Sequence, residues 1–417
     1  MHEAFWNGLF DVRWEDAPLG EEAIRLVQRL RKDGYAERTW RDYGHAVIHL
    51  GRVLYEGAGR MTEVRDDAVV EDFVDRHLPV CCCYRQPPGQ RQANVQRGLR
   101  HLLAMLREEG AIPPIEQEEP PYHALVEGYG RFLLHDRGLA ETTVINYRRY
   151  LRDFLASRGN GVSPADLVQL TEDDLLAFAR RRGAKLGRTA WNHMATSLSS
   201  FYGWLDLQGH GGMHLVKAVP MRRSYRLADL PCALSWKQVQ RLLGSVDRHE
   251  PSGRRNYAML LLIATYGLRG CEVRALRLDS IDWSHDTITI FAPKTRRSRQ
   301  LPLTPPVGEA VLDYLREDRP ASTHDEVFLS SRPPHGPLRS KINPWLNRQL
   351  DKANIDTKRR GAHILRHSLA VHLLRSGETL KSIGDVLGHR SPDTTFIYTK
   401  LHVEDLKTVA LDPETVS

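Results

Sequence analysis

The first half of the chain contains a degenerate internal repeat, and this repeat is the feature that most constrains the fold. The aligned pairs are Gly34 with Gly138, Thr39 with Thr143 and Tyr43 with Tyr147, all at one constant spacing. Each copy has a turn glycine, a threonine predicted to cap a helix, and then apolar residues at helical spacing. Two further blocks, ANVQRGLRHLLAMLREEG and WNHMATSLSSFYGWLDLQG, are amphipathic and end in glycine. Amphipathic helices resemble one another in general, but the shared order of blocks favours duplication and predicts two tandem helical units.

Two Pro-rich stretches separate these units from each other and from the rest of the chain. Residues 111–123 follow the first unit, and residues 214–234 follow the second and contain a basic linker. The predicted boundaries are 1–116 for an N-terminal helical domain, 117–212 for a second helical domain, 213–230 for the linker and 231–417 for a C-terminal domain. Two helical units of roughly 100 residues are of ordinary domain size.

The C-terminal region is predicted to be mostly helical around a small antiparallel sheet. Ser235 and Gln238 form a capping-box pattern, and a long apolar helix over 257–266 ends at Gly267. The alternating segments DTITIFAP and RQLPL, joined by a basic turn, predict a β-hairpin. The predicted fold class is therefore mainly α: two helical domains and then a mixed α/β domain with a small sheet.

The composition limits which cellular compartment and which cofactors are expected for the protein. The formal charge of +7 only slightly favours a polyanionic partner. Of the five cysteines, Cys81, Cys82 and Cys83 are consecutive, and no CxxC pair occurs, so neither a disulfide framework nor a zinc site is predicted. The N-terminus lacks the apolar segment of a secretion signal, and no apolar stretch approaches the roughly 20 residues of a membrane span. A cytoplasmic protein without a metal is expected.

Four segments carry residues suited to chemistry on a phosphodiester. TYGLRGCEVRAL contains Arg269, FAPKTRRSRQLPL contains Lys294, HILRH contains His363 and Arg366, and LGHRSPDTTFIYTK contains His389 and Tyr398. Cleavage without a metal needs a nucleophile, positive charge around the phosphoryl oxygens and a proton donor for the leaving oxygen. Arginine donates to phosphate in a fork that lysine cannot reproduce.

Each of these residues alone has a simpler interpretation. Arg269 could complement a helix dipole, and Tyr398 could be a core residue. His363 and His367 stand four residues apart and could be a metal pair, although no Glu or Cys ligand pattern lies nearby. Glu272 is predicted to be a packing residue. The full set in one order is the stronger signal and favours a catalytic site.

That order resembles the tyrosine recombinase, or phage integrase, family: Arg, Lys, His-x-x-Arg, His and Tyr. The resemblance covers the chain from about Ser235 onward as a catalytic domain, and the unit around Gly138 resembles the family's SAM-like core-binding domain. The first helical unit is expected to be a second, degenerate copy. The resemblance implies that Tyr398 attacks phosphorus to give a 3′-phosphotyrosine, without ATP or metal. It implies that Arg269, Arg366 and His389 stabilise the phosphoryl oxygens, that His363 accepts the tyrosine proton and that Lys294 protonates the leaving 5′ oxygen.

The expected partner is double-stranded DNA, held by the core-binding and catalytic domains. The candidate DNA-contacting residues are basic side chains of the second helical unit, the linker and the hairpin turn: Arg148, Arg149, Arg152, Lys185, Arg188, Arg222, Arg223, Arg296 and Arg297. The resemblance also implies a homotetramer, or a hetero-assembly with related recombinases, in which the tail after Lys400 docks on a neighbouring protomer. A bacterial, nucleoid-associated protein is expected.

The predicted function is site-specific recombination in the integration, excision or transposition of a mobile element. One alternative is a type IB topoisomerase, which shares the transesterification but relaxes supercoils as a monomer. The other is a catalytically idle DNA-binding regulator, which has no need to keep Lys294 and Tyr398 together. The core-binding repeat and the tail favour recombination.

Overall fold

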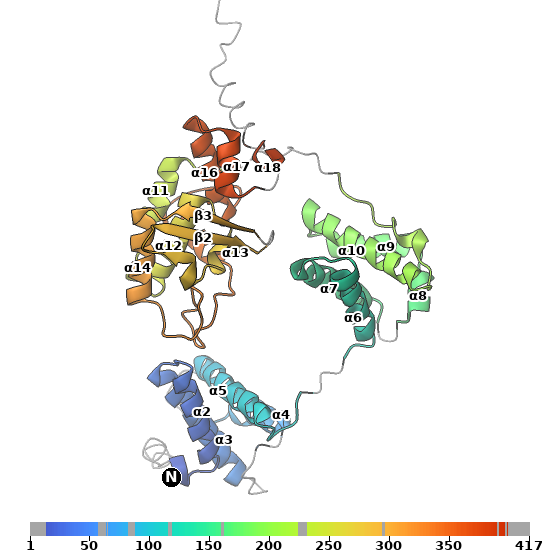
Figure 1. The fold of residues 1–417 in the computed structure, drawn as a ribbon. Coiled ribbons are helices and arrows are strands. Elements are labelled where there is room, and N and C mark those ends of the chain that lie inside the picture. Colours follow the sequence, from blue (N-terminus) through green and yellow to red (C-terminus); the bar gives the residue numbers. More distant parts are fainter. Residues whose placement is uncertain are drawn as a thin grey trace, which may run out of the picture. The chain divides into compact units, whose positions relative to one another are not determined.

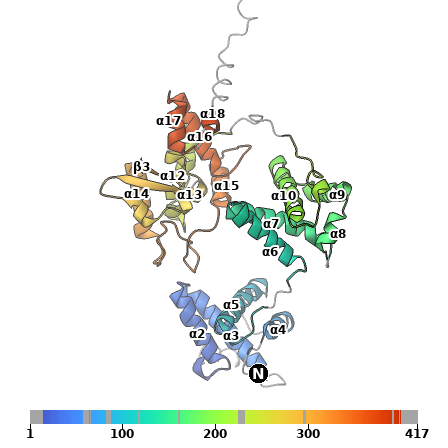
Figure 2. The same cartoon turned by 45° about the vertical axis from the view of Figure 1, so that its right-hand side comes forward.

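The computed structural model describes residues 14–56, 64, 66–81, 88–115, 119–159, 162–223, 232–293, 297–389, 392–396 and 398. The chain divides into two compact units, residues 116–230 and the combination of residues 1–115 with 231–417. Hydrophobic residues form separate cores in the N-terminal, middle and C-terminal parts. Figures 1 and 2 show the helices and strands of each part. Within the described ranges, every helix is too short or too polar to span a bilayer.

The N-terminal part is a helical bundle in which α3 packs against both α2 and α5. Its core includes Leu26, Leu50 and Leu99, each almost fully buried. The elements are η1 (Trp14–Asp16), α2 (Gly20–Lys32), α3 (Glu37–Glu56), α4 (Asp67–Asp72), the short π-helix η2 (Phe73–His77) and α5 (Pro88–Glu108).

The middle unit repeats this arrangement, because α7 packs against both α6 and α10. Its core is rich in aromatic residues, with Tyr129, Phe154 and Phe201 fully buried. The elements are α6 (His123–Arg131), η3 (Phe132–Asp136), α7 (Glu141–Ala156), α8 (Pro164–Val168), α9 (Glu172–Gly183), α10 (Arg188–Leu207) and η4 (Met213–Leu215). The N-terminal part and the middle unit therefore share one pattern of helix packing, which is the arrangement that the internal repeat predicts.

The turn glycines of the repeat are confirmed, but the predicted threonine caps are wrong. Gly34 and Gly138 adopt positive φ angles of 84° and 59°. Helix α3 begins at Glu37 and α7 at Glu141, which places Thr39 and Thr143 inside the first turn. Ala140 provides the extended N-cap of α7 without a side-chain bond, and the Thr143 N–H donates to its carbonyl.

The C-terminal part surrounds the apolar helix α12 (Gly253–Tyr266), which packs against α11, α13, α14 and α16. The predicted hairpin is confirmed: β2 (Thr287–Ala292) and β3 (Arg297–Pro302) pair antiparallel, and β1 (Ile281–Asp282) completes a sheet of order β1-β2-β3. The predicted capping box of Ser235 and Gln238 opens α11 (Trp236–Gly244). The remaining elements are α13 (Gly270–Arg274), η5 (Leu278–Ser280), α14 (Pro305–Glu317), α15 (Asn343–Lys352), α16 (His363–Arg375), α17 (Leu380–Leu387) and α18 (Pro392–Phe396).

Helices α16, α17 and α18 lie together at one end of this C-terminal part in both views (Figures 1 and 2). Helix α17 packs against both of the others, and a small apolar cluster beneath them includes Leu369, Leu387 and Tyr398. The mainly helical fold with one small antiparallel sheet agrees with the predicted fold class. It brings three of the four segments singled out in the sequence, those that contain Arg269, Arg366 and His389, to neighbouring helix ends.

Candidate active site

Two helices of the C-terminal part end in left-handed glycines, and each glycine lies one or two residues before a predicted site residue. Gly267 (φ 61°) ends α12 two residues before Arg269, and Gly388 (φ 63°) ends α17 one residue before His389. A Cβ on Gly267 would lie 2.3 Å from a methyl carbon of Leu387. Glycine is therefore required at Gly267 for both the backbone angle and the close packing of the two helix ends.

Arg366 joins these two helix ends from α16. One terminal nitrogen of its guanidinium donates to the carbonyl of Gly267, and the other donates to the carbonyl of Leu387 at 2.7 Å. Its side chain is buried, with 2% exposed. Burial lowers the pKa of Arg366 to about 10, and the nearby Arg269 adds to the effect, so the group stays charged at neutral pH.

Glu272 ion-pairs with two of the arginines near the site. Its carboxylate accepts from the guanidinium of Arg269 at 2.7 Å, from the backbone N–H of Arg269 at 2.9 Å and from Arg299 at 3.3 Å. Burial raises the pKa of Glu272, but the bonds from Arg269 and the charge of Arg299 outweigh it and hold the pKa below its usual value. Glu272 is buried, as the sequence predicts, but it acts as an ion-pair partner rather than as a packing residue.

Tyr398 is almost fully buried, and its hydroxyl contacts a histidine that sequence reasoning did not assign to the site. Its exposed fraction is 1%, and its oxygen lies 2.9 Å from Nδ1 of His367. Burial raises the pKa of Tyr398 to about 12, while Arg366 and Arg269 lower it in part. The sequence signal for His367 is its position directly after Arg366 in HILRH, whereas its spacing from His363 indicates only a possible metal pair.

His389 lies parallel to the ring of Tyr398, with 6.4 Å between centroids and 8° between planes. Its Nδ1 is 2.8 Å from the hydroxyl of Thr395. Burial, reinforced by Arg366 and Arg269, lowers the pKa of His389 to about 4. Burial and neighbouring positive charges likewise lower the pKa of His367 to about 4. Both imidazoles are therefore neutral at neutral pH.

The other predicted catalytic residues lie differently. His363 is exposed at the first position of α16, with its ring centroid 6.1 Å from that of His367. Lys294 and Arg296 belong to the hairpin turn and lie outside the described residues, as does the tail after Lys400. Thus Arg269, Arg366, His389 and Tyr398 are brought together, with His367, Glu272 and Arg299 added to them.

The candidate DNA-contacting residues fall into two groups. Several are already engaged: Arg148 and Arg152 pair with Glu127, Arg149 lies over the ring of Tyr150, and Arg222 lies 4.1 Å from the ring centroid of Trp191 while donating to the carbonyl of Leu186. The others that the structure describes, Lys185, Arg188, Arg223 and Arg297, are exposed, as are Arg149, Arg152 and Arg222. The second group is the more available for a phosphate backbone, because the first group already makes the contacts given above.

The lowered pKa values of His367 and His389 predict that the stability of the fold depends on pH. Their folded-state pKa values of about 4 lie below the ordinary 6.5, so the unfolded chain binds protons first as the pH falls. Stability is unaffected by these groups above pH 6.5 and decreases between pH 6.5 and 4, by up to about 1.4 kcal/mol per pH unit for each histidine. We expect His367→Gln to reduce this slope in urea unfolding of the C-terminal part, whereas His285→Gln, at an exposed site, leaves it unchanged. An equal slope in wild type and His367→Gln would contradict the assignment.

Comparison with known proteins assigns these features to a class. The model of the phage integrase family matches residues 233–405, and the model of its N-terminal SAM-like domain matches residues 126–209. The chain is 39% identical to the inferred integrase/recombinase y4rA of Sinorhizobium fredii over 75% of this chain and 77% of that protein. It is 31% identical to y4rF of the same organism over 96% of this chain and 92% of that protein. A structure of the XerH site-specific recombinase bound to palindromic difH substrate has a TM-score of 0.52 at 19% identity, covering 71% of this chain and 98% of that one.

The fold and the matched segments define a tyrosine recombinase, an enzyme of DNA strand transfer. The chain belongs to the phage integrase family. The predicted fold class and function are confirmed at this level, and residues 1–115 lie outside both family models.

Proposed function

We propose that the chain is a site-specific recombinase that cuts and rejoins duplex DNA through a 3′-phosphotyrosine on Tyr398, in the integration, excision or transposition of a mobile element. The observation that carries this proposal is the surroundings of Tyr398. Its hydroxyl contacts His367, and its ring lies parallel to that of His389. The positive charges of Arg366 and Arg269 lower the pKa of Tyr398 in part. Relatives named as integrases or recombinases support the same activity.

The proposed reaction is a transesterification, in which one phosphoester bond forms and another breaks. The oxygen of Tyr398 attacks phosphorus, the bond from phosphorus to the 5′ oxygen breaks, and a proton moves to that oxygen. Attack by a second 5′-hydroxyl reverses the step and releases the tyrosine. Because one phosphoester replaces another, the bond energy is conserved and the step needs no external energy source.

The two arginines stabilise charge on the phosphoryl oxygens. Arg366 is fixed by the carbonyls of Gly267 and Leu387, and Arg269 is fixed by Glu272. Their remaining N–H groups donate to the phosphate in positions set before DNA binds, which reduces reorganisation in the transition state. Stabilisation of the phosphoryl oxygens is the role that the family resemblance implies for Arg269 and Arg366.

The histidines provide neutral donors and acceptors. If Nδ1 of His389 accepts from the hydroxyl of Thr395, its proton lies on Nε2, which then donates to a non-bridging oxygen. Neutral His367 contacts the Tyr398 hydroxyl and is therefore placed to accept its proton, a role that the family resemblance gave to His363. We assign the first proton transfer to His367 and a phosphate contact to the exposed His363.

DNA and a partner protomer complete the proposal. Exposed Lys185, Arg188, Arg223 and Arg297 contact the phosphate backbone and position the duplex without reading its sequence. Recombination joins two duplexes, so the active species is an assembly of several protomers, either identical or related.

The test is to incubate the protein with a nicked suicide substrate that carries its own element's end. The proposal expects an SDS-stable adduct that joins protein to the 3′ end of the cleaved strand, together with recombinant products from paired sites. Supercoil relaxation by a monomer without recombinants would instead indicate the topoisomerase alternative. DNA binding without any adduct would indicate the regulator.

Lys294 is tested by the chemistry of the leaving group. We expect Lys294→Ala to slow cleavage of ordinary DNA by about 100-fold or more, because the departing 5′ oxygen then lacks its acid. A 5′-bridging phosphorothiolate needs little protonation, so it should restore the Lys294→Ala rate to within about tenfold of wild type. Rescue of Arg296→Ala rather than Lys294→Ala would move the role to Arg296.

A further inference from the structure

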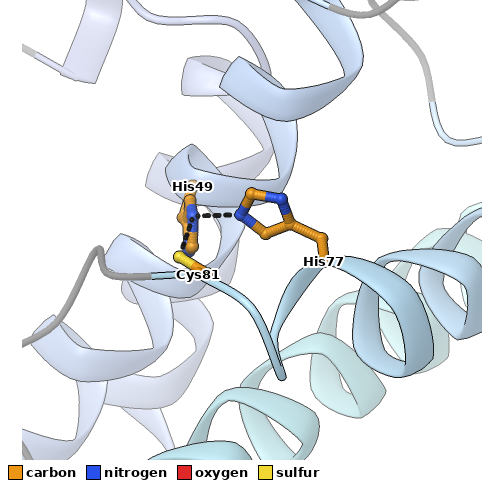
Figure 3. A group of neighbouring side chains, drawn as sticks. All are labelled: His49, His77 and Cys81. Carbon is orange, nitrogen blue, oxygen red and sulfur yellow. Dashed lines mark hydrogen bonds between the residues drawn. The ribbon is translucent and has the colours of Figure 1, made fainter.

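Three metal-ligating side chains converge in the N-terminal part of the chain, in residues outside both family models. His49 lies in α3, His77 is the last residue of η2 and Cys81 follows four residues later. Nε2 of His49 is 3.1 Å from Nε2 of His77 and 3.6 Å from the sulfur of Cys81. Figure 3 shows the two imidazoles and the thiol pointing toward one another.

The spacing of these atoms resembles the edges of a zinc coordination sphere. Zinc binds imidazole nitrogen at about 2.0–2.1 Å and thiolate sulfur at about 2.3 Å, usually in a tetrahedron. These lengths separate two nitrogens by about 3.4 Å and a nitrogen from a sulfur by about 3.6 Å. Both measured separations are within a few tenths of an ångström of these values, and all three ligand atoms lie within 4.8 Å of one another.

Packing fixes the orientation of both rings. His49 is buried, with 1% exposed, and meets Phe73 edge to face at 5.1 Å between centroids. The same Phe73 stacks on His77 at 5.1 Å and 16°. Ligands held before the ion arrives lose little freedom when it binds, which favours a specific site over a fortuitous contact.

We propose that His49, His77 and Cys81 bind one Zn²⁺ ion, which joins α3 to the end of η2 and stabilises the N-terminal part. The three side chains supply three of the four usual ligands, and water or a further side chain supplies the fourth. The thiol loses its proton on binding, so the affinity rises with pH. The absence of a CxxC pair argued against zinc in the sequence, but the H-x3-C spacing of His77 and Cys81 places both ligands one helical turn apart.

The experiment uses the full chain without an affinity tag, freed of metal by a chelator under reducing conditions. Titration with Co²⁺ should give one equivalent bound per chain, with the intense visible bands of a tetrahedral site and a sulfur-to-cobalt charge-transfer band. Zn²⁺ should displace the cobalt and raise the midpoint of thermal unfolding, because it binds the folded state. Cys81→Ser should abolish the charge-transfer band and weaken cobalt binding at least about tenfold. His49→Gln and His77→Gln should weaken cobalt binding by a similar factor.

Matched controls are Cys232→Ser and His101→Gln, which remove the same side-chain types elsewhere and should leave the titration unchanged. Far-UV circular dichroism checks that each variant folds. Because the wild-type stoichiometry and its sulfur-to-cobalt band need no variant, they test the proposal even where a substitution unfolds the chain. Wild type that binds no cobalt at micromolar concentration, or a band that persists in Cys81→Ser and disappears in Cys82→Ser or Cys83→Ser, would overturn the assignment.

Discussion

Tyr398→Phe is expected to bind DNA as wild type does and to form no covalent adduct with a nicked suicide substrate. Phenylalanine fills the same buried volume but has no oxygen to attack phosphorus, so the loss should be complete. The measurement is denaturing electrophoresis of end-labelled substrate, with binding followed separately by a mobility shift. Loss of the buried contact with His367 should change stability by only about 1 kcal/mol, so the folded protein remains available for the assay.

Tyr314→Phe is the matched control. Tyr314 is as buried as Tyr398, with 1% exposed, and its hydroxyl accepts from the backbone N–H of Leu329 at 3.2 Å. This variant should lose a comparable amount of stability and still trap DNA at the wild-type level. An adduct with Tyr398→Phe would assign the nucleophile to another residue.

Glu272→Ala is expected to lower both the stability of the folded protein and its rate of cleavage. The carboxylate is buried, with 1% exposed, and balances Arg269 and Arg299, while the buried Arg366 lies close enough to be affected. Removal of one partner from a buried ion pair typically costs about 3–5 kcal/mol, because it leaves uncompensated charge. Arg269 also loses its anchor, so we expect adduct formation by the remaining folded protein to slow by about tenfold or more.

Glu272→Gln separates the two effects, because the amide keeps the shape and one acceptor oxygen but removes the charge. We expect a smaller loss of stability than in Glu272→Ala and a cleavage rate between that of wild type and Glu272→Ala. Glu317→Gln, at an exposed position near the end of α14, should behave as wild type in both assays. If urea unfolding and single-turnover cleavage of Glu272→Ala both matched wild type, the ion pairs would have no such role.

The contact between His367 and Tyr398 in the DNA-free protein also affects when Tyr398 can react. His367 has a pKa of about 4 and faces a hydroxyl with a pKa of about 12. Transfer of the proton in this state is therefore strongly unfavourable, because burial lowers the pKa of the acceptor and raises that of the donor. A phosphate near Arg366 and Arg269 would neutralise part of the positive charge that lowers the pKa of His367, which makes it a stronger base. The free protein therefore holds its nucleophile in an unreactive state.

The sequence predicted the elements whose signals are local. The capping box of Ser235, the glycine that ends α12 and the β2–β3 hairpin all depend on residues within a few positions of one another, and each is confirmed. The caps at Thr39 and Thr143 were wrong because both helices begin two residues before the threonines, which places the threonines inside the first turn.

Contacts between distant residues could not be predicted from spacing. Arg299 reaches Glu272 only because α13 packs against β2, whose partner strand β3 carries Arg299. His367 reaches Tyr398 only because α16 packs against α17, which in turn packs against α18, shortly before Tyr398. The cluster of His49 with His77 and Cys81 depends in the same way on the packing of α3 against η2. These partners come from tertiary packing, so they have no periodic signal in the sequence.

The bonds of Arg366 to the carbonyls of Gly267 and Leu387 have a consequence for how such an enzyme can acquire new target sites. Main-chain oxygens are present whatever side chains surround them, so they continue to position the arginine when nearby residues change. Selection for a new target could therefore change the side chains that contact base edges while leaving the cutting chemistry intact. Variants selected in this way should accumulate changes on the DNA-facing surface and none at the two glycines that end α12 and α17.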